Sequence, residues 1–200
     1  MSRYIFLFDL DSTVIKTEIL PAICRQLGFL DSTSLSAENT MSGEFPFIKK
    51  FLQKMDILKK IPISEVRQMI EKIELNQALA DFIQQHHERC YIITENPDVW
   101  IEGLIRELDM EHHTFCSKAL VEDNFILNIF PVIDKNIVAR QFALPYVAVG
   151  NGNDNAEMIE NANIGIGYGG VCEISPAVLN SASHAIYEEN KLVEFLERLL

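Results

Sequence analysis

The stretch YIFLFDLDST occupies residues 4–13 and sets the expectation for the whole fold. Its apolar first half, from Tyr4 to Phe8, is typical of a strand that is buried on both faces of a sheet. Asp9 and Asp11 follow directly, one residue apart. Two like charges at this spacing repel each other, so folding alone gives no reason for the pair. We therefore interpret the two aspartates as groups that hold a ligand.

The composition is that of an ordinary globular domain, or of a core domain with a small insertion. The chain has 200 residues, of which 48% are hydrophobic and 23% charged. No apolar stretch approaches the ~20 residues that a membrane span needs, and the first apolar run is too short for a secretory signal. We expect a cytoplasmic protein. The net charge of −12, without a Lys/Arg cluster, argues against nucleic acid as a partner.

Strand-like and helix-like segments alternate along the chain, which favours an α/β fold. We expect a Rossmann-like parallel sheet with helices on both faces. Its strands are predicted at 4–8, 90–94, 114–116, 146–149 and 164–166, with a hairpin over 120–129. Its helices are predicted at 78–86, 98–108, 135–142, 156–162 and 191–200. Between the first two strands, helical patterns at 17–28, at 47–58 and from residue 62 predict a small helical cap over 14–76, inserted into a core of 1–13 and 77–200.

Polar residues follow three of the predicted buried strands. They are Asp9 to Asp11, Thr94 to Asn96, and Gly150 to Asn155. Ligands of open parallel sheets bind at the carboxyl ends of the strands, so these segments are expected to converge. Oxygen-rich sites suit Mg2+, often together with a substrate phosphate. A hydroxyl from Thr94 and a positive charge from Lys135 would complete a phosphoryl-transfer site with a covalent aspartate.

The ordered set FDLDST, Thr94, Lys135 and GNGNDNAEMI resembles the four motifs of the haloacid dehalogenase (HAD) superfamily. The DxDST form is similar to the phosphoserine phosphatase-like branch, which has a helical cap. Glu18 stands where that branch has its substrate-binding glutamate. The segment TMSGEFPF, residues 40–47, resembles the one that places a methionine and a phenylalanine against the substrate, here Met41 and Phe47.

The resemblance implies a role for each motif residue. Asp9 would be the nucleophile, and Asp11 the general acid and then the general base. Thr94 and Lys135 would bind the transferring phosphoryl group. The cap would close over the substrate and exclude water. The implied Mg2+ ligands are drawn from the first and last motifs: Asp9, Asp11 (through its backbone carbonyl), Asn151, Asp154 and Asn155.

Two departures from the family pattern bear on metal and substrate. Asn151 stands where the family has a metal-binding aspartate, and the ND pair that follows is reversed as Asp154-Asn155. We therefore expect weaker metal binding, with compensation from Asp154 if the turn lets it reach the ion. Glu95 replaces a glycine of the second motif, and Lys54 stands where the cap has an arginine that pairs with the substrate carboxylate. Lysine cannot reproduce the bidentate fork of arginine, so a substrate other than phosphoserine is expected.

The sequence thus predicts a Mg2+-dependent phosphatase acting on a small phosphorylated metabolite, as a monomer or homodimer. Glu18, Met41, Phe47, Lys54 and Glu95 are its predicted substrate-binding residues. One alternative is a catalytically weak binding or regulatory protein that keeps the fold with a degenerate metal motif. Another is a dehalogenase. The dehalogenase branch of the superfamily carries out its reaction without a metal. Asp11 argues against it, because dehalogenases lack the second aspartate.

Overall fold

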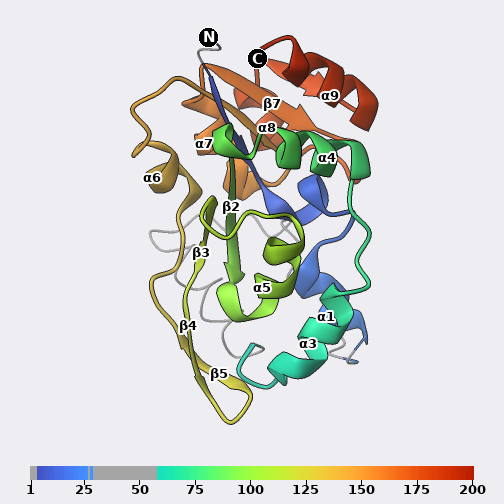
Figure 1. Ribbon diagram of the computed structural model, residues 1–200, viewed down its shortest axis with the longest axis vertical. Coiled ribbons are helices and arrows are strands. Elements are labelled where there is room, and N and C mark those ends of the chain that lie inside the picture. The colour runs from blue at the N-terminus through green and yellow to red at the C-terminus, as the bar shows by residue number, and fades with distance from the viewer. Residues whose placement is uncertain (1–3, 27, 29–57) are drawn as a thin grey trace.

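The molecule is built around a six-stranded parallel sheet (Figure 1). The computed structural model describes residues 4–26, 28 and 58–200. The strand order is β3-β2-β1-β6-β7-β8, and all neighbours in it are parallel. The strands are β1 (Ile5–Phe8), β2 (Cys90–Pro97), β3 (Thr114–Ser117), β6 (Tyr146–Gly150), β7 (Ile164–Tyr168) and β8 (His184–Ile186).

The first strand lies in the middle of this sheet. Phe8 is level with Ile92 of β2 on one side and with Val149 of β6 on the other. All four residues of β1 are buried, as the continuous apolar run predicts for a strand covered on both faces. The predicted α/β fold with a Rossmann-like parallel sheet is therefore confirmed.

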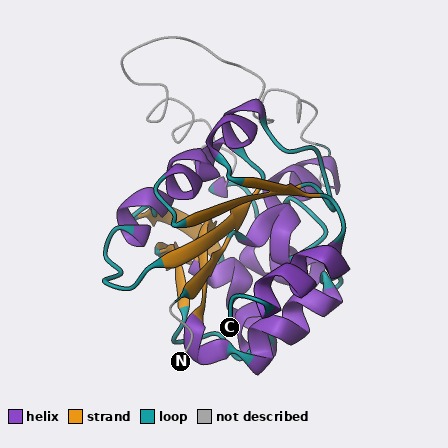
Figure 2. Cartoon of the chain, turned by 90° about the horizontal axis from the view of Figure 1, so that it is seen from above, coloured by secondary structure: helices purple, strands orange, loops and turns teal. Residues whose placement is uncertain are grey.

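Helices cover both faces of the sheet, as Figure 2 shows from above. Alternate residues of β1 separate the two sides of the core. Phe6 and Phe8 belong to a cluster that includes residues of α4 (Gln77–Gln85), α5 (Asp98–Glu107) and α9 (Glu189–Glu197), and of two further helices described below. Ile5 and Leu7 belong to a second cluster, shared with α6 (Lys135–Ala139), α7 (Ala156–Glu160) and α8 (Pro176–Ser181).

Two helices are described within the predicted cap, 14–76. They are α1 (Ile19–Gln26) and α3 (Ile63–Ile70). Their apolar faces, including Ile23 and Val66, join the same buried cluster as Phe6 and Phe8, so this part of the segment packs directly on the core. The helix expected at 47–58 lies outside the described residues except for Leu58, and the division into core and cap remains a prediction.

The predicted hairpin forms a separate two-stranded antiparallel sheet. It consists of β4 (Ala119–Glu122) and β5 (Phe125–Ile129). Asp123 and Asn124 connect them with φ angles of 46° and 71°, a left-handed conformation that Asp and Asn tolerate better than most residues. The structure also adds α8 and β8, which the sequence patterns did not predict. Among the described helices, none has the length and apolar character needed to cross a membrane.

Candidate active site at the carboxyl edge of the sheet

The turn after β1 directs both aspartates of the first motif to the edge of the sheet. Asp9 is still extended, and its backbone N–H donates to Val149 O of the neighbouring strand at 3.0 Å. The chain then makes one wide turn over residues 10–14, which Ile15 N closes by donating to Leu10 O at 3.1 Å. Ser12 has a φ of 53°, the left-handed region in which a non-glycine residue is uncommon. The turn thus places Asp9 and Asp11 near each other at the carboxyl edge of the sheet.

Asp9 is the centre of a buried polar cluster, with 3% of its surface exposed. Its Oδ1 lies 2.6 Å from Lys135 Nζ and accepts a hydrogen bond from Leu10 N at 2.7 Å. Its Oδ2 accepts a hydrogen bond from Asn155 Nδ2 at 2.8 Å. Burial raises the pKa of Asp9, and the ammonium group of Lys135 opposes that shift. Asp9 is therefore held in place from two directions by residues that follow other strands.

Lys135, at the start of α6, is shared between two carboxylates. Besides Asp9, its Nζ contacts Asp154 Oδ2 at 2.5 Å, and it donates to Asn155 Oδ1 at 3.1 Å. Burial disfavours the charged ammonium, but the carboxylates of Asp154 and Asp9 outweigh it and raise the pKa of Lys135. Lys135 is therefore a buried cation that contacts the carboxyl groups of both Asp9 and Asp154.

Asp11 is held by one backbone and one side-chain hydrogen bond. Its Oδ1 accepts from Ile19 N at 2.9 Å, at the start of α1, and its Oδ2 accepts from Asn96 Nδ2 at 2.6 Å. Burial, and then the nearby charge of Asp9, raise the pKa of Asp11 to about 7. A carboxyl group that titrates near neutral pH can both give and take a proton, as a general acid–base must.

The second strand brings Thr94 and Asn96 to the same edge. Thr94 Oγ1 accepts hydrogen bonds from Asn96 N at 3.2 Å and from Asn96 Nδ2 at 2.9 Å. Both bonds use the oxygen as acceptor, so the hydroxyl hydrogen can serve a ligand. Asn96 thus links Thr94 to Asp11. The sequence placed Asn96 in the converging segment, but it gave no signal that the side chain would contact Asp11.

The glycine-rich turn after β6 supplies the third side of the cluster. A Cβ at Gly150 would come within 2.6 Å of Asn155 Cγ, so only glycine lets Asn155 fold back over the strand end. Both polar atoms of the Asn155 side chain are engaged, with Asp9 and with Lys135. The turn directs Asp154 to Lys135 in the same way. The side chains of Asp154 and Asn155, both predicted as metal ligands, therefore hold Lys135 and Asp9 in this arrangement.

Asn151 lies next to this cluster and has one free ligating atom. It is 5% exposed, and its Nδ2 donates to Cys172 Sγ at 2.7 Å. Its backbone carbonyl accepts from Ser175 N at 2.9 Å. Within the described parts of the chain, nothing donates a hydrogen bond to Asn151 Oδ1. A carbonyl oxygen that accepts no hydrogen bond from the protein is available to a cation.

The donor set fits a hard divalent cation such as Mg2+. The available donors are the Asp9 carboxylate, the Asp11 backbone carbonyl and Asn151 Oδ1, all of them oxygens. No cluster of three or more His, Cys, Asp or Glu residues that could hold a metal occurs within residues 4–26, 28 and 58–200. The site therefore fits the ion, but Asn151 is a neutral ligand where an aspartate would supply a negative charge.

The predicted substrate-binding residues are only partly covered by the structure. Glu95, directly after Thr94, is half-buried in β2. Glu18 is exposed and immediately precedes α1, and its charge acts on Cys172 beside Asn151. Both acidic residues thus lie near the catalytic edge. Met41, Phe47 and Lys54 lie outside the described residues.

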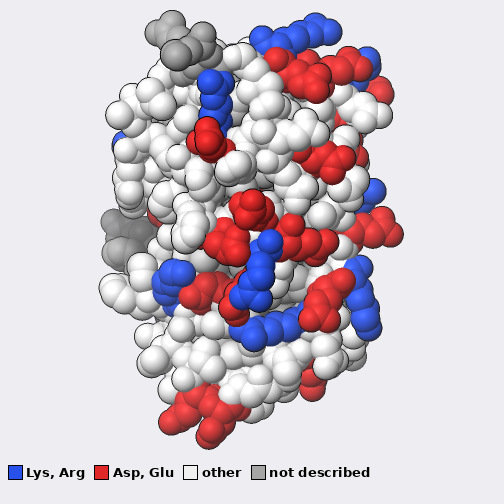
Figure 3. All heavy atoms as spheres, in the orientation of Figure 1, with Lys and Arg blue, Asp and Glu red and all other residues white. Residues whose placement is uncertain are grey.

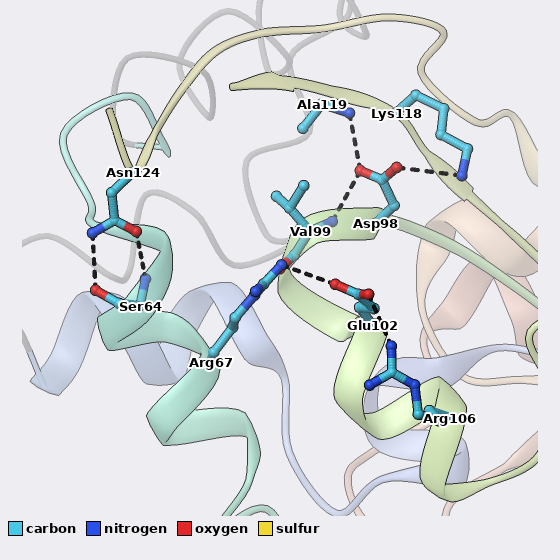
Figure 4. A network of polar contacts seen from close by, with 9 residues as sticks. All are labelled: Ser64, Arg67, Asp98, Val99, Glu102, Arg106, Lys118, Ala119 and Asn124. Atoms are coloured by element: carbon cyan, nitrogen blue, oxygen red, sulfur yellow. Dashed lines mark hydrogen bonds and ion pairs between the residues drawn. The ribbon is translucent and has the colours of Figure 1, made fainter. Parts of the chain in front are cut away.

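A polar network fixes α3 to the core beside the site (Figure 4). Asn124, in the hairpin turn, accepts from Ser64 N at 3.1 Å and donates to Ser64 Oγ at 2.9 Å. It thereby caps a helix whose own N-cap residue, Pro62, makes no side-chain hydrogen bond to the helix. Arg67 of α3 donates to Val99 O at 2.7 Å and to Glu102 of α5 at 3.0 Å. This half of the predicted cap is thus attached to the helix that follows the second motif.

Charged residues elsewhere on the surface are mixed in sign. On the face seen in Figure 3, basic side chains lie next to acidic ones. Ion pairs of this kind include Arg106 with Glu102 at 2.9 Å and Lys118 with Asp98 at 3.3 Å. Such exposed pairs contribute little to stability individually.

Comparison with known proteins places the chain in a family. A family model described as haloacid dehalogenase-like hydrolase matches residues 6–144, which includes the turn after β1, Thr94 and Lys135. The chain belongs to the haloacid dehalogenase-like hydrolase family. The predicted superfamily is thus confirmed.

Relatives in this family carry the name of one activity. A phosphoserine phosphatase of Lactococcus lactis is 24% identical over 215 aligned positions, covering 99% of this chain and 97% of the relative. One of Archaeoglobus fulgidus is 23% identical over 181 positions, covering 83% of this chain, which spans only 52% of that relative's length. A solved phospho-aspartyl intermediate analogue of phosphoserine phosphatase has a TM-score of 0.78 at 19% identity, covering 98% of this chain and 99% of its own. The predicted likeness to the phosphoserine phosphatase-like branch is therefore confirmed, and the structural match shows the fold.

Proposed function

We propose that this protein is a Mg2+-dependent phosphatase that hydrolyses a small phosphomonoester through an aspartyl-phosphate on Asp9. The observation that carries the proposal is the environment of that residue. Asp9 is a buried carboxylate beside a buried lysine, with a second carboxyl group, Asp11, two residues away that titrates near neutral pH. A nucleophile, a fixed positive charge and an acid–base group are the parts that this chemistry needs.

The residues divide the reaction into two displacements at phosphorus. In the first, an oxygen of Asp9 attacks the phosphorus, the bond to the leaving oxygen breaks, and protonated Asp11 gives its proton to that oxygen. In the second, Asp11 takes a proton from water, the water oxygen attacks the phosphorus, and Asp9 leaves as a free carboxylate. Lys135 and the Thr94 hydroxyl bind the phosphoryl oxygens throughout. A bound Mg2+ would neutralise charge on the phosphoryl group, held by Asp9, the Asp11 carbonyl and Asn151.

Two departures from the family pattern, Glu95 and Lys54, favour a substrate other than phosphoserine. Glu95 adds negative charge beside Thr94, where a substrate carboxylate would be repelled, and the lysine cannot form the bidentate pair of an arginine. Glu18 also lies near the catalytic edge. A phosphomonoester with an amine or hydroxyl groups would instead find hydrogen-bond acceptors there. We therefore include in the proposal a small phosphorylated metabolite without a carboxylate as substrate. The working form that we propose is a cytoplasmic monomer or homodimer.

Hydrolysis of p-nitrophenyl phosphate with and without Mg2+ tests the proposal. The native chain is expected to turn over only with the metal, and Asp9→Asn to lose turnover, because an amide is a poor nucleophile. Asp81→Asn is the matched control, since Asp81 is an exposed carboxylate on α4 bonded to Gln77. Turnover that survives Asp9→Asn would refute the nucleophile. A screen of phosphorylated metabolites would then rank amine-bearing against carboxylate-bearing esters.

A second function is favoured by the last motif. Asn151 carries no charge, and Asp154 contacts Lys135. These features suit a catalytically weak protein that binds a phosphorylated ligand without turning it over. Metal-independent binding of a phosphate mimic, together with no turnover of any ester, would support this alternative over the phosphatase.

A further inference from the structure

Cys172 contacts the side chain of Asn151, one of the proposed metal ligands. It lies half-buried in the loop between β7 and α8, and its Sγ accepts a hydrogen bond from Asn151 Nδ2 at 2.7 Å. Asn151 itself is 5% exposed. The sulfur atom therefore engages the donor end of this carboxamide.

An asparagine at this position needs an orienting partner, which an aspartate would not. A carboxylate presents an oxygen to a cation whichever way it is turned. A carboxamide has one oxygen, and a half-turn replaces it with an NH2 group, which is a donor and cannot bind a cation. Near Asp9 and Asp11 the amide nitrogen would be drawn toward the carboxylates. A hydrogen-bond acceptor that engages Nδ2 competes with the carboxylates and favours the orientation that leaves the oxygen free for a cation.

We infer that Cys172 is a positioning residue that fixes the Asn151 carboxamide with its oxygen toward the metal. The inference rests on the proposed function, since it assumes that a divalent cation binds at Asn151. Two observations carry it. Nδ2 is bonded to the sulfur, and Oδ1 has no donor within the described residues. Cys172 itself does not bind the ion in this arrangement. It determines which atom of the Asn151 side chain binds the ion.

Direct metal binding, without substrate or turnover, tests the inference. Mn2+ is the probe because it takes the same oxygen ligands as Mg2+, and its free ion is observed by electron paramagnetic resonance. Cys172→Ala removes the acceptor and is expected to raise the dissociation constant about tenfold, as loss of a ligand's orienting partner commonly does. Cys172→Ser keeps an acceptor, so it is expected to bind Mn2+ close to the native value.

A double-mutant comparison separates orientation from general disturbance of the loop. In the Asn151→Asp background the symmetric carboxylate needs no orientation. There, Cys172→Ala is expected to change the dissociation constant by no more than about twofold, the usual scatter for independent sites. Thermal unfolding of each variant by circular dichroism checks that the fold is intact. Alanine in a half-buried loop is not expected to leave a large cavity.

The possible outcomes are distinct. If the native chain does not bind Mn2+, the metal-dependent part of the proposed function fails, and this inference with it. If the native chain binds Mn2+ and Cys172→Ala binds equally well, only the inference fails. It also fails if Cys172→Ser binds as weakly as Cys172→Ala, or if the loss is the same in the Asn151→Asp background. A loss confined to Cys172→Ala in the native background supports it.

Discussion

Replacing Lys135 by methionine tests whether the buried lysine neutralises Asp9. Methionine keeps a side chain of similar length, so the change removes charge and little volume. Asp9 would then be a buried carboxylate without its cation, and breaking such a pair costs about 3–5 kcal/mol of stability. Asp154, the other partner, has 43% of its side chain exposed and can turn to water, so it adds little. We therefore expect Lys135→Met to lose about 3 kcal/mol at neutral pH.

The assay is urea unfolding in metal-free buffer, followed by tryptophan fluorescence. Trp100 is the single tryptophan of the chain and is 1% exposed, so its emission reports unfolding of the core. Without Lys135, the folded-state pKa of Asp9 rises further above its unfolded value. A raised carboxyl pKa means that stability is lost as pH rises, so the deficit of the variant should shrink toward about pH 5.

Two further variants decide the interpretation. In the Asp9→Asn background, Lys135→Met removes only the half-exposed pair with Asp154 and no pair with a buried carboxylate, so it should cost about 2 kcal/mol less than in the native chain. Lys191→Met is the matched control, because Lys191 forms an exposed pair with Glu194 and should cost less than about 1 kcal/mol. The reasoning is refuted if Lys135→Met costs no more than Lys191→Met, or if Asp9→Asn leaves its cost unchanged.

Three other variants address acid–base behaviour, metal affinity and the attachment of α3. Because the pKa of Asp11 is raised to about 7, the metal-free native protein should lose a few kcal/mol of stability as the pH rises from about 4 to 7, and Asp11→Asn should not. Urea titrations at several pH values measure this difference. Equal pH profiles for the two proteins would contradict the raised pKa of Asp11. Asn151→Asp should tighten Mg2+ binding about tenfold by calorimetry, since a charged ligand replaces a neutral one; weaker binding would show that the ligand is misplaced. Arg67→Ala should cost about 1–2 kcal/mol in urea unfolding, because a charged donor to Val99 O is lost. Arg106→Ala, which breaks only an exposed pair, should cost under about 1 kcal/mol, and equal losses would argue against the anchoring role.

The sequence was informative wherever a local pattern decides the structure. The apolar run of β1 predicted a strand buried on both faces, and the alternation of strands and helices predicted the parallel sheet. From these two features it follows that residues after β1, β2 and β6 meet at one edge. Asp9, Thr94 and the turn after Gly150 are found there. Parallel pairing fixes which ends of the strands coincide, so no side-chain information was needed for this step.

The contacts that depend on tertiary structure were not predictable in this way. The bond from Asn96 to Asp11 joins residues 85 positions apart, and Asn124 caps a helix 60 positions earlier. The hydrophobic periodicity of a sequence carries no information about contacts between residues so far apart in the chain. The hydrogen bond between Cys172 and Asn151, 21 positions apart, was missed for the same reason. The strand β8 was missed because three residues, two of them exposed, make too short a pattern.

The central position of β1 also has a consequence for synthesis on the ribosome. Ile5 to Phe8 leave the tunnel before both of the strands that pair with them, one of which begins at Cys90 and the other at Tyr146. Until the segment from Tyr146 to Gly150 has emerged, one edge of this very apolar strand has no partner. Nascent chains of intermediate length should therefore be the ones that chaperones bind and that aggregate most readily.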